Sequence, residues 1–321
     1  MKKKILILSG DPNSINSELI YKSWKKINNS LRKKIYLISN FNLLKKQFKK
    51  LNYPIKIIKL KNEKENIISN KLKVINIDIK FKKPFGVLKK DASKFVIDCL
   101  NKGHQLALKK NVTGLINCAI DKKLLKQKNI GVTEYLASKC NVKNNSEVML
   151  IRNKKLSVVP ITTHIDIKQV SKKIKSKIIA NKVKIIEKWF KEKFNKKPKF
   201  GILGLNPHNA ELRMDSEEYK IIVPTILKLK KLGINIKGPL IADTLFINDY
   251  KKFDIIIGMF HDQVLTPFKA IFKFSAVNIT LGLKYLRVSP DHGTAVNLIG
   301  KNKASIDSLL ECISFVNKFG K

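Results

Sequence analysis

The sequence predicts an α/β protein with a largely parallel sheet, because apolar strand-like runs alternate with helix-like segments along almost the whole chain. The chain has 321 residues, of which 44% are hydrophobic, enough for one large domain or two of ordinary size. No Gly/Ser linker and no internal repeat interrupts the alternation. We therefore expect any two domains to share a continuous boundary rather than a flexible tether.

Four apolar runs carry this prediction, and each leads into a segment with helical periodicity. The expected strand–helix pairs are 3–10 with 14–27, 33–40 with 42–51, 155–164 with 167–195, and 199–208 with 216–233. A fifth apolar run, 253–261, contains three consecutive isoleucines and ends at His261, which is followed by Asp262 and Gln263. The isoleucine run indicates a buried strand, and the polar end indicates a functional position.

The formal net charge of +42 raises the question of a nucleic-acid partner. Only four of the 66 basic residues are arginine, at positions 32, 152, 213 and 287, and the lysines are spread along the chain. Dedicated nucleic-acid binders favour arginine for bidentate contacts. We therefore expect a solvated, lysine-rich surface and no nucleic-acid partner; a non-catalytic basic binding protein is kept as a remote alternative.

The cellular setting expected from the sequence is the cytoplasm. No apolar run approaches the roughly 20 residues that cross a membrane, so no membrane partner is expected. The apolar start is followed at once by Asp11-Pro12, which favours a first strand over an export signal. The four cysteines show no CxxC spacing, which argues against a disulfide framework or a zinc ribbon.

Three of the five histidines occupy the same kind of position. His164, His208 and His261 each follow an apolar strand and precede the next helix. Ligands of open α/β sheets bind at the carboxyl ends of strands, where three imidazoles can converge on one divalent metal. His104 lies within a helix-like stretch, and we expect it to be structural or exposed.

The segment after His261 indicates anion binding. Lys269, Asn278 and Arg287 follow at intervals of eight or nine residues, and the rare arginine offers a planar fork for phosphate or carboxylate. In residues 289–295, Asp291 and His292 precede a Gly-Thr pair that we expect to begin a helix and hold an anion. The turns at 9–19 and 112–117 carry no GxGxxG and no P-loop, so the residues that bind a dinucleotide stay unassigned.

Five stretches together resemble one family. They are TTHI (162–165), GLNPH (204–208), GPLIADTLF (238–246), MFHDQ (259–263) and VNITLGLKYLRVSPDHGTA (277–295). In this order they resemble the 4-hydroxythreonine-4-phosphate dehydrogenase family of NAD(P)-dependent, metal-requiring enzymes of pyridoxal 5′-phosphate (vitamin B6) biosynthesis. The resemblance implies an isocitrate/isopropylmalate-dehydrogenase-like fold with a central cleft between two domains, 1–133 with 290–321 and 134–289, the second carrying the metal-binding histidines.

The resemblance also implies the site and its reaction. The metal ligands are His164, His208 and His261, for Zn, Mg, Mn or Co, and the substrate-binding residues are Thr133, Lys269, Asn278 and Arg287. The site is expected at a homodimer interface, with one metal-binding histidine supplied by the partner. Oxidation of 4-hydroxy-L-threonine 4-phosphate by NAD or NADP would be followed by decarboxylation to 3-amino-2-oxopropyl phosphate. The proton acceptor is left open between Asp262, Lys269 and His292.

The chain departs from the family pattern at four places, which we expect to lie mostly in loops that touch substrate or cofactor. Val132 stands where the family has histidine (GVTE for GHTE), and Leu115 and Cys118 replace a proline and a lysine (TGLINC for TGPINK). Where the family has a glycine-rich stretch after NPH, this chain has the shorter NAELRMDSEE. Where the family has GEPAGIG, this chain has GDPNSIN. These changes keep open a sister dehydrogenase acting on threonate or erythronate 4-phosphate. A phosphate acyltransferase is a third, weaker alternative, which would not need the histidines.

Overall fold

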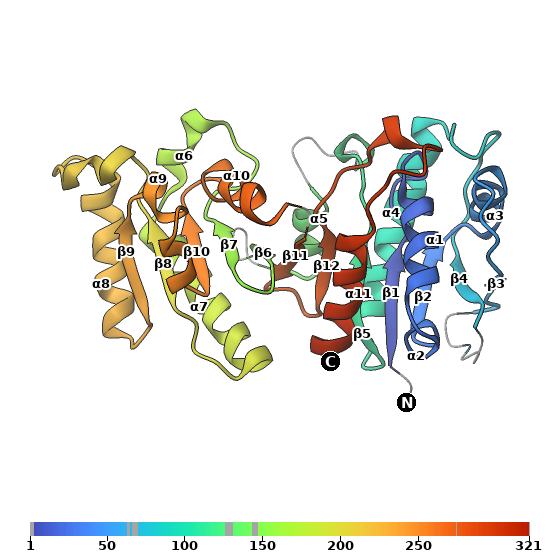
Figure 1. Ribbon diagram of the computed structural model, residues 1–321, viewed down its shortest axis with the longest axis horizontal. Coiled ribbons are helices and arrows are strands. Elements are labelled where there is room, and N and C mark those ends of the chain that lie inside the picture. The colour runs from blue at the N-terminus through green and yellow to red at the C-terminus, as the bar shows by residue number, and fades with distance from the viewer. Residues whose placement is uncertain are drawn as a thin grey trace. The chain divides into compact units, whose positions relative to one another are not determined.

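The structure is a computed structural model that describes residues 3–62, 65, 70–125, 131–142, 147–273 and 275–320. The chain divides into two compact units: unit 1 comprises Met1–Cys140 and Leu283–Lys321, and unit 2 comprises Asn141–Gly282. Each unit combines strands with packed helices (Figure 1), so the α/β prediction is confirmed. The domain boundaries expected from the sequence stay a prediction.

In the described part of unit 1, the strands pair in the order β3-β4-β2-β1-β5-β12, and every pair is parallel. All five residues of β1 are buried, as expected for a parallel strand that is covered on both faces. The strands are β1 (Lys4–Leu8), β2 (Ile35–Ser39), β3 (Ile57–Lys59), β4 (Leu72–Asn76), β5 (Val112–Asn117) and β12 (Arg287–Pro290).

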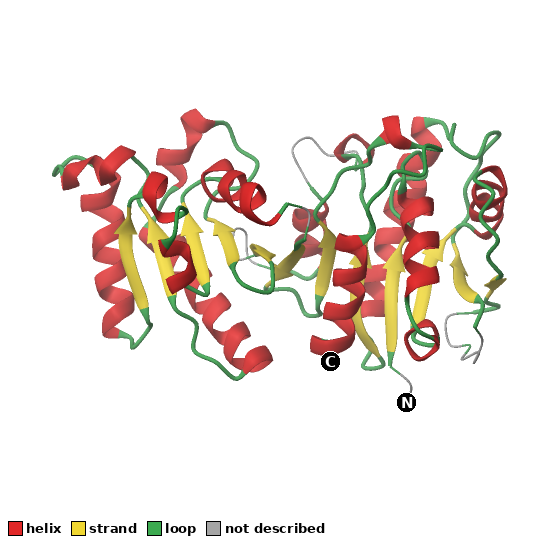
Figure 2. Cartoon of the chain, viewed as in Figure 1, coloured by secondary structure: helices red, strands yellow, loops and turns green. Residues whose placement is uncertain are grey.

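Two helices each pack against three strands of this sheet. α4 packs against β1, β2 and β5, and α11 packs against β1, β5 and β12. Figure 2 shows these helices beside the strands of unit 1. The helices are α1 (Asn16–Lys26), α2 (Asn29–Arg32), α3 (Phe41–Lys50), α4 (Lys89–Ala107), α5 (Val132–Lys139) and α11 (Asp307–Phe319), with 3₁₀ turns η1 (Lys122–Leu124) and η5 (Val296–Leu298).

In unit 2, the described strands pair in the order β11-β6-β7-β10-β8-β9. β6 is antiparallel to both β11 and β7, whereas β7, β10, β8 and β9 run parallel to one another. The strands are β6 (Val148–Arg152), β7 (Ser157–Pro160), β8 (Phe200–Leu203), β9 (Ile236–Leu240), β10 (Ile255–Gly258) and β11 (Val277–Leu281).

The core of unit 2 lies around β10. Ile255, Ile256 and Ile257 are each 0% exposed, which confirms that the isoleucine run is a buried strand. Ile256 belongs to a cluster with Val158 of β7 and Phe268 of α10. The helices of unit 2 are α6 (Ile167–Lys173), α7 (Ser176–Phe194), α8 (Val223–Lys231), α9 (Ala242–Leu245) and α10 (His261–Phe272), with short turns η2 (Pro207–Leu212), η3 (Glu218–Ile222) and η4 (Asp249–Lys252).

Three local expectations are wrong. Residues 167–195 form two helices instead of one, because Ile174 and Lys175 are extended and the Ile174 side chain is buried. Residues 112–117 form the buried strand β5 and not a turn. Gly293-Thr294 begins no helix, and only the 3₁₀ turn η5 follows, after Ala295 at φ 42°. Among the described helices, none combines the length and the apolar character that a membrane crossing needs.

Candidate active site

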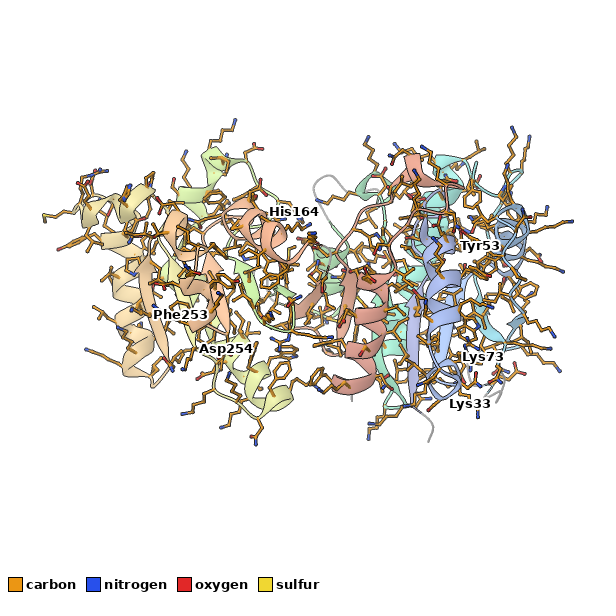
Figure 3. All side chains as sticks on the ribbon, viewed as in Figure 1. Lys33, Tyr53, Lys73, His164, Phe253 and Asp254 are labelled. Atoms are coloured by element: carbon orange, nitrogen blue, oxygen red, sulfur yellow. The ribbon has the colours of Figure 1, made fainter. Side chains whose placement is uncertain are left out.

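The three strand-end histidines leave the same edge of the unit 2 sheet. His164 follows β7, His208 follows β8, and His261 follows β10 and is the first residue of α10. Because β10 pairs in parallel with both β7 and β8, the carboxyl ends of these strands are neighbours. Figure 3 shows His164 beyond one end of the strands of unit 2, and Phe253 and Asp254, which precede β10, at the other end.

Two of the three imidazoles lie together. The ring centroids of His164 and His261 are 5.5 Å apart, with an angle of 41° between the ring planes. His208 is exposed, and the part of the chain that the structure describes contains no group of three His, Cys, Asp or Glu side chains placed to hold a metal ion. The imidazole chemistry of His164 and His261 therefore fits part of the coordination shell of a divalent metal.

Asp262 contacts the histidine that precedes it. The distance between Nδ1 of His261 and Oδ1 of Asp262 is 2.6 Å. Because a carboxylate accepts, the proton lies on Nδ1, and Nε2 of a neutral imidazole is left as the nitrogen that can bind a metal. The Asp262 side chain is 76% exposed, whereas that of His261 is 31% exposed. Asp262 thus orients a candidate ligand.

His208 begins an unusual stretch of backbone. His208, Asn209, Ala210, Glu211 and Leu212 all have φ between 48° and 58°. For residues other than glycine this left-handed conformation costs about 1–2 kcal/mol each. Glycine would adopt this conformation with less strain than the residues found here. Strained backbone of this kind is often found at functional sites.

Arg287 and Thr133, both expected to bind substrate, lie together in unit 1. Nη1 of Arg287 donates to Oγ1 of Thr133 at 3.1 Å, and Nε donates to Oδ1 of Asn117 at 2.6 Å. Arg287 is only 3% exposed, and burial lowers its pKa to about 10, so the guanidinium is charged at neutral pH. Asn117 was not predicted, because only strand pairing brings the end of β5 to Arg287.

Lys269 and Asn278, the other two predicted substrate-binding residues, lie in unit 2. Lys269 is on α10 and Asn278 is on β11, and both are partly buried. Oδ1 of Asn278 is buried, and no donor among the described residues lies within hydrogen-bond distance of it. A buried amide oxygen without a donor is available to a ligand that carries N–H or O–H groups.

His292, a candidate proton acceptor, follows β12 in unit 1 and is partly buried. Nδ1 lies 2.9 Å from the carbonyl oxygen of Gly293 and therefore carries a proton. Nε2 is buried and has no hydrogen-bond partner within the described part of the chain. Burial lowers the pKa of His292 below its usual value of 6.5, so the ring is neutral at pH 7. Nε2 is thus an acceptor.

Three of the residues that set this chain apart from the family pattern lie in or beside elements of unit 1. Val132 is the first residue of α5 and lies beside Thr133. Leu115 and Cys118 are 0% exposed, at and just after β5. Burial raises the pKa of Cys118 to about 12, so the thiol is neutral at pH 7. Cys118 therefore cannot replace the positive charge of the family's lysine.

The chain is similar over nearly its whole length to proteins of one family. A family model described as pyridoxal phosphate biosynthetic protein PdxA matches residues 13–316. The 4-hydroxythreonine-4-phosphate dehydrogenase of Sulfurihydrogenibium sp. (strain YO3AOP1) is 38% identical over 321 residues, covering 97% of this chain and 96% of its own. That of Aquifex aeolicus (strain VF5) is 36% identical, with 98% of each chain covered.

Solved structures agree with the sequence comparison. A crystal structure of 4-hydroxythreonine-4-phosphate dehydrogenase from Klebsiella pneumoniae superposes with a TM-score of 0.84 at 26% identity, covering 98% of this chain and 99% of that one. Isocitrate dehydrogenase from Methylococcus capsulatus, 11% identical, matches with a TM-score of 0.50 over 98% of this chain and 84% of its own. This second match concerns the fold alone and confirms the isocitrate-dehydrogenase-like prediction. The chain belongs to the PdxA family of pyridoxal phosphate biosynthetic proteins.

Proposed function

We propose that the protein oxidises 4-hydroxy-L-threonine 4-phosphate with NAD or NADP and a divalent metal, in pyridoxal 5′-phosphate biosynthesis in the cytoplasm. The observation that carries the proposal is the delivery of His164, His208 and His261 to one sheet edge, in a chain whose relatives are named for this dehydrogenase activity. The hydroxyl-bearing carbon gives its hydride to the nicotinamide, and the hydroxyl proton passes to a base. The resulting β-keto acid then loses carbon dioxide to give 3-amino-2-oxopropyl phosphate.

The three histidines are the proposed metal ligands, with one supplied across the dimer. His164 and His261 are already neighbours, and Asp262 fixes the tautomer of His261. A bound Zn, Co, Mn or Mg ion would supply Lewis acidity, which lowers the pKa of a hydroxyl group and stabilises an enolate. Imidazole ligands suit Zn and Co better than Mg.

Arg287, Thr133, Lys269 and Asn278 are the proposed substrate-binding residues. Arg287 is buried, charged and held by two side-chain acceptors, so its guanidinium is fixed before an anion arrives. A pre-oriented fork loses little entropy when it binds phosphate or carboxylate. Lys269 supplies a second positive charge, and Asn278 supplies the buried acceptor.

We assign the role of proton acceptor to His292. Its ring is neutral at pH 7, and its Nε2 is the kind of acceptor that a general base needs. Asp262 is engaged with His261, which favours a supporting role for this carboxylate. Lys269 carries a charge that suits binding better than proton abstraction. A His292→Asn variant should therefore lose kcat far more than substrate affinity.

A homodimer is proposed because apolar side chains are exposed on the histidine edge of unit 2. Segments that follow β7, β8 and β9 expose Ile165, Ile167, Leu212, Met214, Ile241 and Ile247. Exposed apolar side chains of this kind typically mark an interface. Met214→Asp with Ile247→Asp should give monomers in light scattering, whereas Leu88→Asp, at an exposed apolar position of unit 1, should not. A dimer that survives the first pair of changes would contradict this interface.

A second candidate substrate class is kept because of Val132. The family's histidine at this position is missing beside Thr133, which Arg287 contacts. The candidates are threonate and erythronate 4-phosphate, which lack the amino group. A non-catalytic nucleic-acid-binding role finds no support in a chain whose relatives are named dehydrogenases.

The decisive experiment is an assay of the purified protein with NAD or NADP and Zn²⁺, Co²⁺, Mn²⁺ or Mg²⁺. NADH or NADPH formation is measured with 4-hydroxythreonine 4-phosphate and with the two sugar-acid phosphates. We expect turnover with the first substrate, carbon dioxide release, and loss of both when the metal is chelated. Turnover with a sugar-acid phosphate alone would reassign the substrate, and no turnover with any of them would refute the proposal.

A further inference from the structure

Gln263 links the carboxyl ends of two neighbouring strands of unit 2. Its Oε1 accepts a hydrogen bond of 2.7 Å from the N–H of Met259, directly after β10. Its Nε2 donates a hydrogen bond of 2.7 Å to the carbonyl oxygen of Gly204, directly after β8. A primary amide can accept and donate at the same time. Gln263 therefore joins the segment that carries His261 to the segment that carries His208.

Thr162 ties the third segment to the same peptide. Its hydroxyl donates to the carbonyl oxygen of Met259 at 2.7 Å, and its backbone N–H donates to the same oxygen at 3.1 Å. Thr162 is 7% exposed and lies two residues before His164. Met259 is thus held at its N–H by Gln263 and at its carbonyl by Thr162. The segment that carries His164 is fixed against the segment that carries His261.

Glu218 fixes the turn that leads to His208. Its Oε1 accepts from the N–H groups of Leu205 at 2.7 Å and Asn206 at 2.8 Å, and its Oε2 accepts from Nδ2 of Asn206 at 2.9 Å. Glu218 is 0% exposed. Burial raises its pKa, but hydrogen bonds from Asn206 and Leu205 outweigh burial, so the net pKa is lowered and the carboxylate is charged.

Two glycines leave the space that these side chains occupy. A Cβ on Gly258 would lie 2.5 Å from Cγ1 of Val264 and 2.9 Å from Oε1 of Gln263. A Cβ on Gly204 would lie 2.9 Å from Oε1 of Glu218 and would collide with the side chain of Asn209. Both glycines lie at strand ends where a side chain from a following helix approaches the backbone. Close approach of this kind requires glycine.

We infer that Gln263, with Thr162 and Glu218, is a positioning residue that holds the three histidine-bearing segments in one register. The inference rests on the proposed function, because it gives these residues a task at the proposed metal ligands. We call Thr162, Gly204, Glu218, Met259 and Gln263 the belt. In the proposed dimer each chain supplies two histidines to one metal site and the third histidine to the other site. Imidazoles on separate loops bind a metal well only if their backbones are held to a fraction of an ångström, so all three segments of a chain need this restraint. The belt supplies this restraint through hydrogen bonds and not through the ligands themselves.

Two substitutions of Gln263 separate its two hydrogen bonds. Gln263→Glu keeps an acceptor for Met259 N–H but cannot donate to Gly204, whereas Gln263→Leu removes both bonds. The measurement is amide hydrogen exchange of the metal-free, full-length protein. We expect at least tenfold faster exchange at Leu205 and Asn206 in both variants, and at Met259 in Gln263→Leu alone. Gln169→Leu, on α6 and outside the belt, is the matched control and should change none of these rates.

Metal affinity gives a second readout. It would not change if Gln263 and Thr162 only stabilised the fold. In Co²⁺ titrations followed by the visible spectrum, Gln263→Leu and Thr162→Val should weaken affinity about 10- to 100-fold, the range typical of residues that orient metal ligands. Thr162→Ser keeps the hydroxyl and should restore affinity to within about threefold of the wild type. Thermal unfolding of each metal-free variant checks that the fold is retained.

The outcomes separate this inference from the proposed function. If the wild type turns over substrate and binds Co²⁺, but Gln263→Leu binds it equally tightly, the inference is wrong and the function stands. If Gln263→Leu speeds exchange only at Met259, the link to the His208 segment does not exist. If the wild type neither binds metal nor forms NADH, the proposed function fails. In that case, the hydrogen-exchange rates still test whether the belt holds the three segments together.

Discussion

Nδ1 of His261 and Oδ1 of Asp262 lie 2.6 Å apart, and this contact assigns a proton to one nitrogen of a candidate metal ligand. The carboxylate stands next in sequence to the histidine and needs no tertiary contact to reach it. Its position at the start of α10 also suits the positive end of the helix. The pair therefore fixes which nitrogen faces outward, before any metal arrives.

Replacing Asp262 should weaken metal binding without unfolding the protein. We expect Asp262→Ala to lower Co²⁺ affinity about tenfold, the low end for an orienting carboxylate, because Asp262 is 76% exposed. Asp262→Asn keeps an acceptor and should lose less. Isothermal titration of the two variants measures the effect. Equal affinity for Asp262→Ala and the wild type would show that the contact has no orienting role.

Arg287→Lys should damage substrate binding although it preserves the charge. An ammonium group cannot donate to both Asn117 and Thr133 in the geometry of the guanidinium fork. We expect KM for the phosphorylated substrate to rise at least tenfold, which corresponds to about 1.4 kcal/mol. Arg213→Lys is the control, because Arg213 is exposed and pairs only with Asp215 among the described contacts. If the KM of Arg287→Lys were within twofold of the wild-type value, Arg287 would not be a substrate-binding residue.

The four cysteines of the native protein should not react with a thiol reagent. Cys99, Cys118, Cys140 and Cys312 are all free and buried, and burial raises the pKa of Cys118 to about 12. A protonated, inaccessible thiol does not attack a disulfide reagent. We expect the thiols to react only at the rate of global unfolding. After denaturation, each chain should consume four equivalents of the reagent. Rapid reaction of one native thiol would show that a cysteine is accessible.

Stability should fall as the pH drops below about 6.5 because of two partly buried histidines, His104 and His292. Burial lowers the pKa of His292, and burial with the nearby Lys139 and Lys284 lowers that of His104. The unfolded chain then binds more protons than the folded one between the folded pKa and 6.5, so stability rises with pH there. The urea midpoint should be lower at pH 5.5 than at pH 7.5.

His104→Gln isolates one contribution to this pH dependence. His104 contacts the hydroxyl of Tyr285 through Nδ1 at 3.1 Å, and glutamine can replace that contact without titrating. The variant should show a smaller loss of midpoint between pH 7.5 and 5.5 than the wild type. An identical loss in both proteins would show that His104 titrates normally in the folded state.

Much of the fold followed from the sequence, because local periodicity reflects burial on strands and helices. The isoleucine run of β10, the first strand β1 and the helical position of His104 were all correctly predicted. The motifs led to the PdxA family, which the comparisons confirm. Predictions failed where tertiary packing overrides local pattern, as at Ile174, whose burial accompanies the break between α6 and α7.

By itself, the sequence determined that three histidines stand at strand ends, since that is a property of neighbouring residues along the chain. Only the tertiary structure decided that β7, β10 and β8 are adjacent and parallel, which brings His164 beside His261. The same holds for Asn117 at Arg287 and for Gln263 at Gly204, contacts between residues 170 and 59 positions apart. The physical reason is that strand order and register are set by the packing of the whole sheet, which no short stretch of sequence encodes.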